Sequence, residues 1–380
     1  MTQGSAPPAD RLPYGGWREG DPVAARRWVA LEHPLELESG RHLPGVRLAY
    51  QTWGRLDREG SNAVLVLHAL TGDAHLTGPA APGQAGPGWW EGVVGPGLAL
   101  DTDRYFVVAP NVLGGCQGST GPSSKGPDGS PWGSRFPRLT LRDTVRAETA
   151  LADALGVRSW AAVIGGSMGG MRALEWSLIH PDRVRRALVM ACPAATSAWQ
   201  IAWAAPQLHA IRSDPHWLDG DYHDTGRVPS EGLGVARRIA HITYRGSREL
   251  DERFGRLPQD GEDLDDRGRY AVESYLDHQA GKLVRRFDAA SYVLLTEAMN
   301  AHDVGRGRGG VAAALKAMPE RTIVAGVDTD HLYPLHQQEE IARHLPVPGR
   351  VRVIESAQGH DGFLTATDQV SALVEELLAR

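Results

Sequence analysis

The amino-acid sequence predicts an α/β protein with a mostly parallel central sheet, flanking helices and an inserted helical lid. Short apolar runs rich in β-branched residues recur along the chain, as buried parallel strands require. Helical patterns separate these runs, and strands that alternate with helices favour a mostly parallel sheet. The interval 194–310 lacks such runs and its patterns are helical, so we expect it to form the lid.

The strand predictions rest on the period of the apolar residues. Residues 46–53 (VRLAYQTW) alternate, which predicts an antiparallel strand. The continuous apolar runs, which predict buried parallel strands, are 63–68, 105–109, 160–164, 186–190, 321–325 and 351–354. The predicted helices are 144–155, 171–179, 337–345 and 369–378 in the core, and 234–242 and 289–301 in the lid. In the first of these helices we expect Arg146 and Glu148 to face solvent.

These patterns divide the chain into a core domain of residues 31–193 and 311–380 and a lid domain of residues 194–310. The glycine run 305–310 marks the return from the lid to the core. The segment 1–30 opens with a Pro/Ala/Gly-rich stretch, so we expect it to be partly disordered. Loops and insertions at the carboxyl edge of such a sheet carry function.

Composition and charge argue against several classes of protein. With 42% hydrophobic and 23% charged residues, the chain has an ordinary globular composition. A formal net charge of −6 does not favour a nucleic-acid partner, which usually requires a basic patch. No run of about 18 apolar residues occurs and the N-terminus does not resemble a secretory signal, so we expect no membrane span. Cys116 and Cys192 form neither a disulfide framework nor a zinc spacing, so we expect a cytoplasmic protein without a bound metal.

The most specific local motif is Gly165–Gly170 (GGSMGG), which contains the pattern G-x-S-x-G. It follows the strand 160–164 and precedes the helix 171–179, which is the setting of a nucleophile elbow in the α/β-hydrolase fold. In an elbow the serine occupies a strained turn, and the glycines leave room for a close strand–helix crossing. The alternative is a glycine-rich turn with an incidental serine. The flanking strand and helix favour Ser167 as the nucleophile of an α/β-hydrolase fold.

A serine nucleophile needs a general base, and the base needs an acid that orients it. In this fold the order along the chain is serine, acid, histidine, so both partners follow Ser167. His360 lies in the loop GHDG after the last predicted strand and is the predicted base, with a surface loop histidine as the alternative. The acid is either Asp328, which is nearer to the preceding strand, or Asp330, which sits against a Leu-Tyr-Pro stretch that would fix the loop.

The oxyanion that forms during acyl transfer needs backbone N–H donors. One donor is the N–H of Met168, the residue after the nucleophile, and the other comes from the loop after an early strand. The stretch 68–73 (HALTGD) is that loop, and we assign the second donor to the N–H of Leu70. His68 is interpreted as a residue that orients the loop, with direct participation in the chemistry as the alternative. Cys116 has no local base partner and is interpreted as a small loop residue.

Several stretches along the chain carry a resemblance to a known family. They are YQTWG (50–54), HALTGD (68–73), NVLGGCQGSTGP (111–122), GGSMGG (165–170), ARRIAHITYR (236–245), TDHLYP (329–334) and GHDGF (359–363). In these stretches the sequence resembles the homoserine O-acetyltransferases of methionine biosynthesis, over nearly the whole chain from about residue 30. Together they are far more specific than the nucleophile elbow alone.

The resemblance implies transfer of an acetyl group from acetyl-CoA to the hydroxyl of L-homoserine, by a ping-pong mechanism through acetyl-Ser167. Acetyl-CoA is then a substrate, and no cofactor is expected. The resemblance also implies a lid that forms a tunnel and mediates a homodimer, and it points to Asp330 as the acid. It marks Arg237, Tyr244 and Asp361 as homoserine-site residues. Arg237 can hold the substrate carboxylate in a bidentate pair and Asp361 can take the ammonium, although a solvated lid charge and a loop cap are the alternatives.

Three alternative functions keep the same fold. A plain serine esterase has an identical triad and passes the acyl group to water. A second alternative keeps the reaction type and changes the substrates, with succinyl-CoA as the donor or serine as the acceptor. A third is a non-catalytic interaction protein, which we expect to have lost a member of the triad. The motifs outside the triad favour the transferase.

Overall fold

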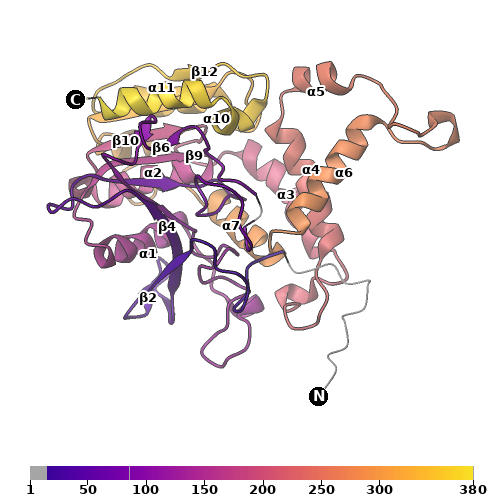
Figure 1. The fold of residues 1–380 in the computed structure, drawn as a ribbon, viewed down its shortest axis with the longest axis horizontal. Coiled ribbons are helices and arrows are strands. Elements are labelled where there is room, and N and C mark those ends of the chain that lie inside the picture. The colour runs from indigo at the N-terminus through magenta and orange to yellow at the C-terminus, as the bar shows by residue number, and fades with distance from the viewer. Residues whose placement is uncertain (1–14, 85, 380) are drawn as a thin grey trace.

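The computed structural model describes residues 15–84 and 86–379, and an eight-stranded sheet forms the centre of this described part (Figure 1). The strand order is β1-β4-β8-β5-β9-β10-β11-β12. The bounds are β1 Arg27–Ala30, β4 Arg47–Trp53, β5 Ala63–Leu67, β8 Phe106–Pro110, β9 Trp160–Gly166, β10 Arg186–Met190, β11 Arg321–Val327 and β12 Arg352–Ile354. β4 pairs antiparallel with β1 and β8, and the other neighbours pair parallel. The predicted mostly parallel sheet is confirmed, including its antiparallel strand at 46–53.

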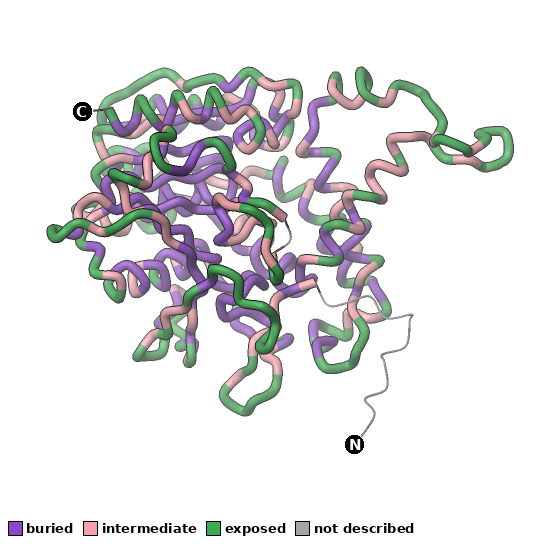
Figure 2. Tube along the Cα trace, in the orientation of Figure 1, coloured by how far each residue is buried: buried purple, intermediate pink, exposed green. Residues whose placement is uncertain are grey.

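The sheet separates two hydrophobic cores, because successive side chains of a strand point to opposite faces. In β5, Leu65 belongs to one core and Val64 to the other. The helices around the sheet are α1 Leu141–Ala154, α2 Met168–Ile179, α8 Val311–Leu315, α9 Leu335–His344, α10 Gly362–Thr365 and α11 Thr367–Leu378. Helices α1, α2 and α9 pack into the core of Leu65, and α11 packs into the core of Val64. Figure 2 shows the resulting buried interior between exposed outer surfaces.

Five of the six predicted helices begin two to four residues earlier than their apolar period indicates, and α1 and α2 show why. Helix α1 begins at Leu141 because Thr140 and Asp143 form a capping box, in which each side chain accepts from the other residue's backbone N–H. Helix α2 begins at Met168, immediately after the strand–helix turn at Ser167. In the described part of the chain, two short strand pairs lie outside the main sheet, β2 Leu35–Glu36 with β3 His42–Leu43 and β6 Val94–Gly95 with β7 Leu100–Asp101.

The prediction that Glu148 of α1 faces solvent is wrong. Its side chain is buried between α1 and α2, where its carboxylate accepts hydrogen bonds from Arg172 Nε at 3.0 Å and Trp176 Nε1 at 2.7 Å. A buried carboxylate is tolerated when a buried guanidinium neutralises it, and Arg172 is itself fully buried. Arg146 is exposed, as expected. The partner of Glu148 lies on another helix, so the pattern of α1 does not reveal it.

The chain between β10 and β11 is helical, as predicted for the lid. Its helices are α3 Ala198–Arg212, α4 Ser230–Tyr244, α5 Ser247–Phe254, α6 Ala271–Val284 and α7 Ala289–Asn300. The two ends of this insertion lie side by side, because Val304 N–H donates to Ala194 O at 3.0 Å and Thr196 N–H donates to His302 O at 2.9 Å. In Figure 1, α3 to α6 stand beside the sheet, and α7 returns to pack on the core.

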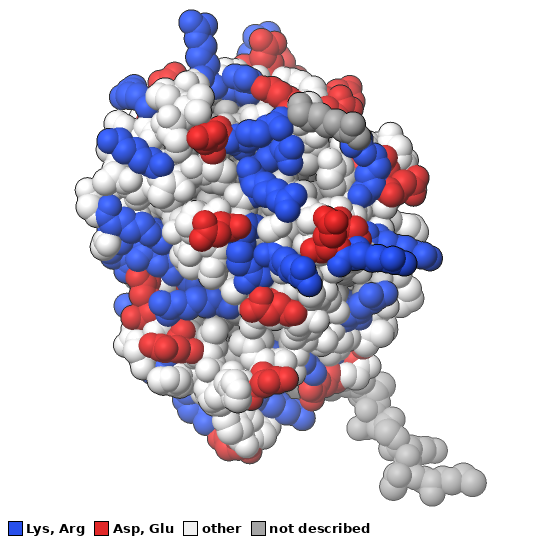
Figure 3. Space-filling model, turned by 90° about the vertical axis from the view of Figure 1, so that its left-hand side faces the viewer, with Lys and Arg blue, Asp and Glu red and all other residues white. Residues whose placement is uncertain are grey.

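Strand β1 lies inside the segment 1–30, for which we predict partial disorder. It pairs with β4 and so closes one edge of the main sheet. Residues 1–14, which carry the Pro/Ala/Gly-rich stretch, lie outside the described residues. In the described part of the chain, no helix is both long and apolar enough to cross a membrane. On the face shown in Figure 3, cationic and anionic side chains are interspersed.

Candidate active site

Ser167 lies at the turn between β9 and α2, with backbone angles φ 57° and ψ −127°. A positive φ is rare for a residue other than glycine, and such strain persists only where the surroundings fix it. Ser167 N–H donates to Met190 O of the neighbouring strand at 3.0 Å. A Cβ at Gly165 would lie 2.2 Å from Gly169 O, and one at Gly169 would lie 2.0 Å from Leu67 O. The glycines of the motif therefore allow the strand–helix crossing that presents the serine.

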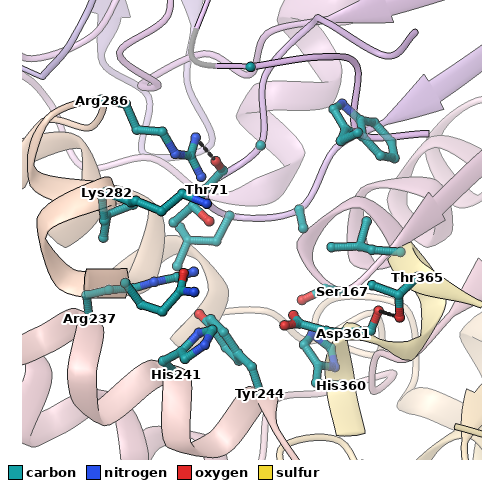
Figure 4. Close-up of a pocket in the computed structure, with 18 of the residues that line it drawn as sticks. Thr71, Ser167, Arg237, His241, Tyr244, Lys282, Arg286, His360, Asp361 and Thr365 are labelled. Atoms are coloured by element: carbon teal, nitrogen blue, oxygen red, sulfur yellow. Dashed lines mark hydrogen bonds between the residues drawn. The ribbon is translucent and has the colours of Figure 1, made fainter. Parts of the chain in front are cut away.

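The structure brings His360 and Asp330 together from the loops after β12 and β11. His360 Nδ1 lies 2.6 Å from Asp330 Oδ2. Asp330 Oδ1 accepts backbone N–H bonds from Leu332 at 2.8 Å and Tyr333 at 2.9 Å, which fix the carboxylate. Ser167, Asp330 and His360 are all buried, with 6%, 5% and 4% of their surface exposed. Figure 4 shows Ser167 and His360 on the same side of one cavity.

The structure also separates the two candidate acids. Asp328 is exposed, and its carboxylate accepts a hydrogen bond from the Ser356 N–H at 3.0 Å. Asp330 is the candidate that contacts His360. Its backbone position, three residues beyond the end of β11, turns the side chain back toward the loop after β12.

His68 holds the predicted oxyanion loop as a neutral residue. Its Nδ1 lies 2.7 Å from Ala69 O, and its Nε2 lies 3.0 Å from Val112 N. Because a carbonyl only accepts and a backbone N–H only donates, the proton is on Nδ1 and Nε2 is the acceptor. Burial, together with the charge of Arg172, lowers the pKa of His68 to about 3. Both ring nitrogens are occupied, so His68 is not available as a base.

The two predicted oxyanion donors lie beside the nucleophile. Met168 is the first residue of α2, so its N–H has no acceptor within the helix. Leu70 and Ser167 line the same cavity, and no backbone hydrogen bond among the described residues uses the Leu70 N–H. Arg172, paired with Glu148, donates to the carbonyl of His68 at 3.3 Å. The buried ion pair therefore helps to hold the predicted oxyanion loop against α2.

Comparison with known proteins agrees with this geometry. A family model described as alpha/beta hydrolase fold matches residues 62–367. The chain is 69% identical to the homoserine O-acetyltransferase of Thermobifida fusca (strain YX), over 100% of both chains. The chain belongs to the homoserine O-acetyltransferase family. Among solved structures it resembles a homoserine O-acetyltransferase from Bacillus anthracis, with a TM-score of 0.85, 26% identity and coverage of 93% of this chain and 97% of that chain. It also resembles esterase E22, with a TM-score of 0.84, 25% identity and coverage of 93% and 99%.

In this member of the family, a cavity of about 430 Å³ contains all three residues marked for the homoserine site. Arg237 and Tyr244 come from α4, and Asp361 follows His360. Figure 4 shows Arg237 on the wall opposite Ser167 and Asp361. The guanidinium of Arg237 stacks on the Tyr244 ring at 5.3 Å, and its buried Nε has no hydrogen-bond partner in the described structure. A buried donor without a partner is free to bind an anionic ligand.

Asp361 is held by Arg245, which the sequence did not single out. Arg245 Nη1 lies 3.4 Å from Asp361 Oδ2, and Arg245 also donates to Glu249 at 2.6 and 3.2 Å. Burial raises the pKa of the Asp361 carboxyl, and the nearby charges of Arg237, His360 and Arg245 oppose this shift. Arg245 ends the stretch ARRIAHITYR, which was the available signal for it.

The sequence also did not single out His241, Lys282 and Arg286, which carry basic groups into the cavity. His241 of α4 lies with its Nε2 2.8 Å from the Tyr275 hydroxyl, and burial lowers its pKa to about 3. Lys282 is in the last turn of α6, and Arg286 follows that helix. Both line the cavity with His241. The sequence carries no local signal for Lys282 or Arg286, because only the packing of α6 beside the oxyanion loop brings them to the site.

Proposed function

We propose that the chain transfers an acetyl group from acetyl-CoA to the side-chain hydroxyl of L-homoserine, a reaction of methionine biosynthesis. The observation that carries this proposal is one cavity that combines two sets of residues. Ser167 and His360 can form an acyl-enzyme and pass its acyl group on. Arg237 and Asp361 present a cation and an anion on opposite walls. That charge pattern complements the carboxylate and ammonium of an amino acid. The family's named activity is acetyl transfer to homoserine.

The first half-reaction acetylates the enzyme. His360 Nε2 takes the proton from Ser167 Oγ, and Oγ attacks the thioester carbonyl. Asp330 holds His360 Nδ1–H and stabilises the imidazolium that forms. The N–H groups of Leu70 and Met168 bind the oxyanion. When the C–S bond breaks, His360 returns the proton to the departing thiolate, and CoA leaves acetyl-Ser167.

The second half-reaction uses the same atoms in reverse. Arg237 binds the carboxylate of homoserine and Asp361 binds its ammonium, which directs the side-chain hydroxyl toward His360. His360 takes the hydroxyl proton, and the oxygen attacks the acetyl carbonyl of acetyl-Ser167. Collapse breaks the ester bond to Ser167 Oγ, which recovers its proton from His360. Tyr244, whose ring lies 5.8 Å from that of His360, stacks under Arg237 and orients it.

A serine esterase is the second candidate, and the likeness to esterase E22 favours it. In that reaction water replaces homoserine, and Arg237 and Asp361 have no substrate charge to bind. An activity matrix separates the candidates, with acetyl-CoA and succinyl-CoA each tested against homoserine, serine and no acceptor. The proposal expects thiol release that is fastest with acetyl-CoA and homoserine. Equal release with and without homoserine would favour the esterase instead.

Two further parts of the proposal are a homodimer, supported by exposed residues of the lid, and a cytoplasmic location, supported by the cysteines. Large apolar residues on α3 and α4 expose much of their surface: Trp199 49%, Ile201 42%, Val235 41% and Ile242 46%. Exposed apolar surface of this kind would be covered at a protein interface if the four side chains adjoin. The free, buried thiols Cys116 and Cys192 fit a reducing compartment. Sedimentation of the intact chain tests the dimer, which a single monomeric boundary would exclude.

A further inference from the structure

One wall of the active-site cavity is formed by a single face of α6. Tyr275, Gln279 and Lys282 of α6 line the cavity, at spacings of three or four residues that place side chains on one side of a helix, and Arg286, just beyond the end of α6, lines it too. Figure 4 shows Lys282 and Arg286 across the cavity from Ser167 and His360. The wall that α6 forms therefore ends in two cations, Lys282 in its last turn and Arg286 just after it.

Among the residues that the structure describes, these cations have no carboxylate partner of their own. In the described structure, neither Lys282 nor Arg286 takes part in an ion pair, and Arg286 donates to the carbonyl of Thr71 at 2.7 Å. Burial and the nearby positive charge of Arg237 both lower the pKa of Arg286. Like charges gathered at one place repel, so their arrangement is unfavourable without an anion. The lining carboxylates Asp73 and Asp361 leave the cavity with an excess of positive charge.

Lys282 and Arg237 lie at different depths in the cavity. Ser167 and His360 are buried at the inner end, whereas Lys282 is exposed and so lies at the mouth. Arg237 stacks on Tyr244, whose ring adjoins that of His360, and its charge acts on Asp361, so Arg237 belongs to the inner part of the cavity. A donor that places its thioester at Ser167 must extend the rest of the molecule toward the mouth. In an acyl-CoA that distal part carries the phosphate groups, separated from the thioester by an uncharged arm.

We propose that Lys282, with Arg286 behind it, binds the phosphate groups of the acyl-CoA donor at the mouth of the cavity. The inference rests on the proposed function, because it takes acetyl-CoA as the donor. It assigns the cations of the site to different substrates, with Arg237 for the acceptor carboxylate and Lys282 for the donor phosphates. A lysine in the last turn of a helix can also simply stabilise the helix dipole. That role would leave donor binding unchanged, so kinetics separates the two.

The test compares Lys282→Gln with the charge-matched control Arg285→Gln. Arg285 is exposed at the end of the same helix and is not among the residues that line the cavity. With acetyl-CoA, Lys282→Gln should raise KM about five- to tenfold, the usual size of one charge-assisted contact near solvent. KM for homoserine should not change, and Lys282→Arg should keep the low KM. Added salt should narrow the difference between wild type and variant.

A donor without phosphates completes the experiment. With S-acetyl-N-acetylcysteamine, the ratio of kcat/KM between wild type and Lys282→Gln should be close to one. An unchanged KM for acetyl-CoA, an equal loss with both donors, or a raised KM for homoserine would each overturn the assignment. Failure of the wild type to transfer acetyl from acetyl-CoA to homoserine would instead overturn the proposed function, so the two failures are distinguishable.

Discussion

Replacing Asp330 with asparagine tests how the acid sets the proton on His360. In the structure, Asp330 Oδ1 accepts two backbone N–H bonds, from Leu332 and Tyr333, and Oδ2 accepts from His360 Nδ1 at 2.6 Å. An asparagine must keep its oxygen on the two N–H groups, so its NH₂ group turns toward the imidazole. His360 Nδ1 then becomes an acceptor, and the ring proton moves to Nε2. That tautomer cannot take the proton of Ser167.

The expected loss follows from this change of tautomer. The variant lacks both the base at Nε2 and the carboxylate that stabilises the imidazolium, and such a change costs about 10⁴-fold in kcat. That factor corresponds to about 5.5 kcal/mol in the activation barrier. Asp328→Asn is the matched control, because its exposed oxygen accepts one backbone N–H bond that an asparagine oxygen can also accept. We expect less than a twofold change from the control.

The assay is the steady-state release of CoA with saturating homoserine, with thermal melting to verify that both variants fold. A severe loss in Asp330→Asn alone is the expected result. Similar losses in the two variants, or a severe loss only in Asp328→Asn, would refute the reasoning.

Two further predictions concern the acceptor and the pH dependence of stability. Arg237→Ala should lower kcat/KM for homoserine roughly 30- to 150-fold, because a lost charge-assisted pair costs about 2–3 kcal/mol. Acetylation of the enzyme by acetyl-CoA alone should survive. Loss of that acetylation would place Arg237 elsewhere in the mechanism. Burial holds the pKa of His68 at about 3 and that of His302 at about 4, below the unfolded value. Below about pH 6.5 the unfolded chain therefore takes up protons that the folded chain does not, and the free energy of unfolding decreases as the pH falls. Urea unfolding should therefore show a loss of about 2 kcal/mol for each between pH 7 and pH 5, and a flat profile would contradict the neutral state of both rings.

The parts of the site that the sequence predicts are those carried by local patterns. The elbow at Ser167 requires glycines at fixed offsets between a strand and a helix, and the order of the triad along the chain leads to His360. The choice between Asp328 and Asp330 is different, because two residues of separation decide which carboxylate reaches the loop after β12. Only the hydrogen bond to His360 separates them by geometry.

The parts that the sequence does not predict depend on contacts between distant segments. Glu148 is polar and lies in a helix, yet it is buried because Arg172 and Trp176 of another helix bond to it. Arg245 reaches Asp361 across 116 residues. Helix α6 carries polar residues on the side that faces the cavity, so its pattern resembles a solvated face. A cavity lined with charge and a surface exposed to water give the same sequence pattern.

The central claim is that Ser167 carries the acetyl group between donor and acceptor. Rapid mixing of the wild type with acetyl-CoA alone tests it, followed by mass analysis of the peptide that contains residue 167. A covalent mechanism predicts a burst of about one CoA per active site and one acetyl group on that peptide, with slow hydrolysis afterwards. Ser167→Ala should give neither the burst nor the label. Transfer to homoserine without a burst, with an unlabelled Ser167 and intersecting initial-rate plots, would contradict the acyl-enzyme mechanism.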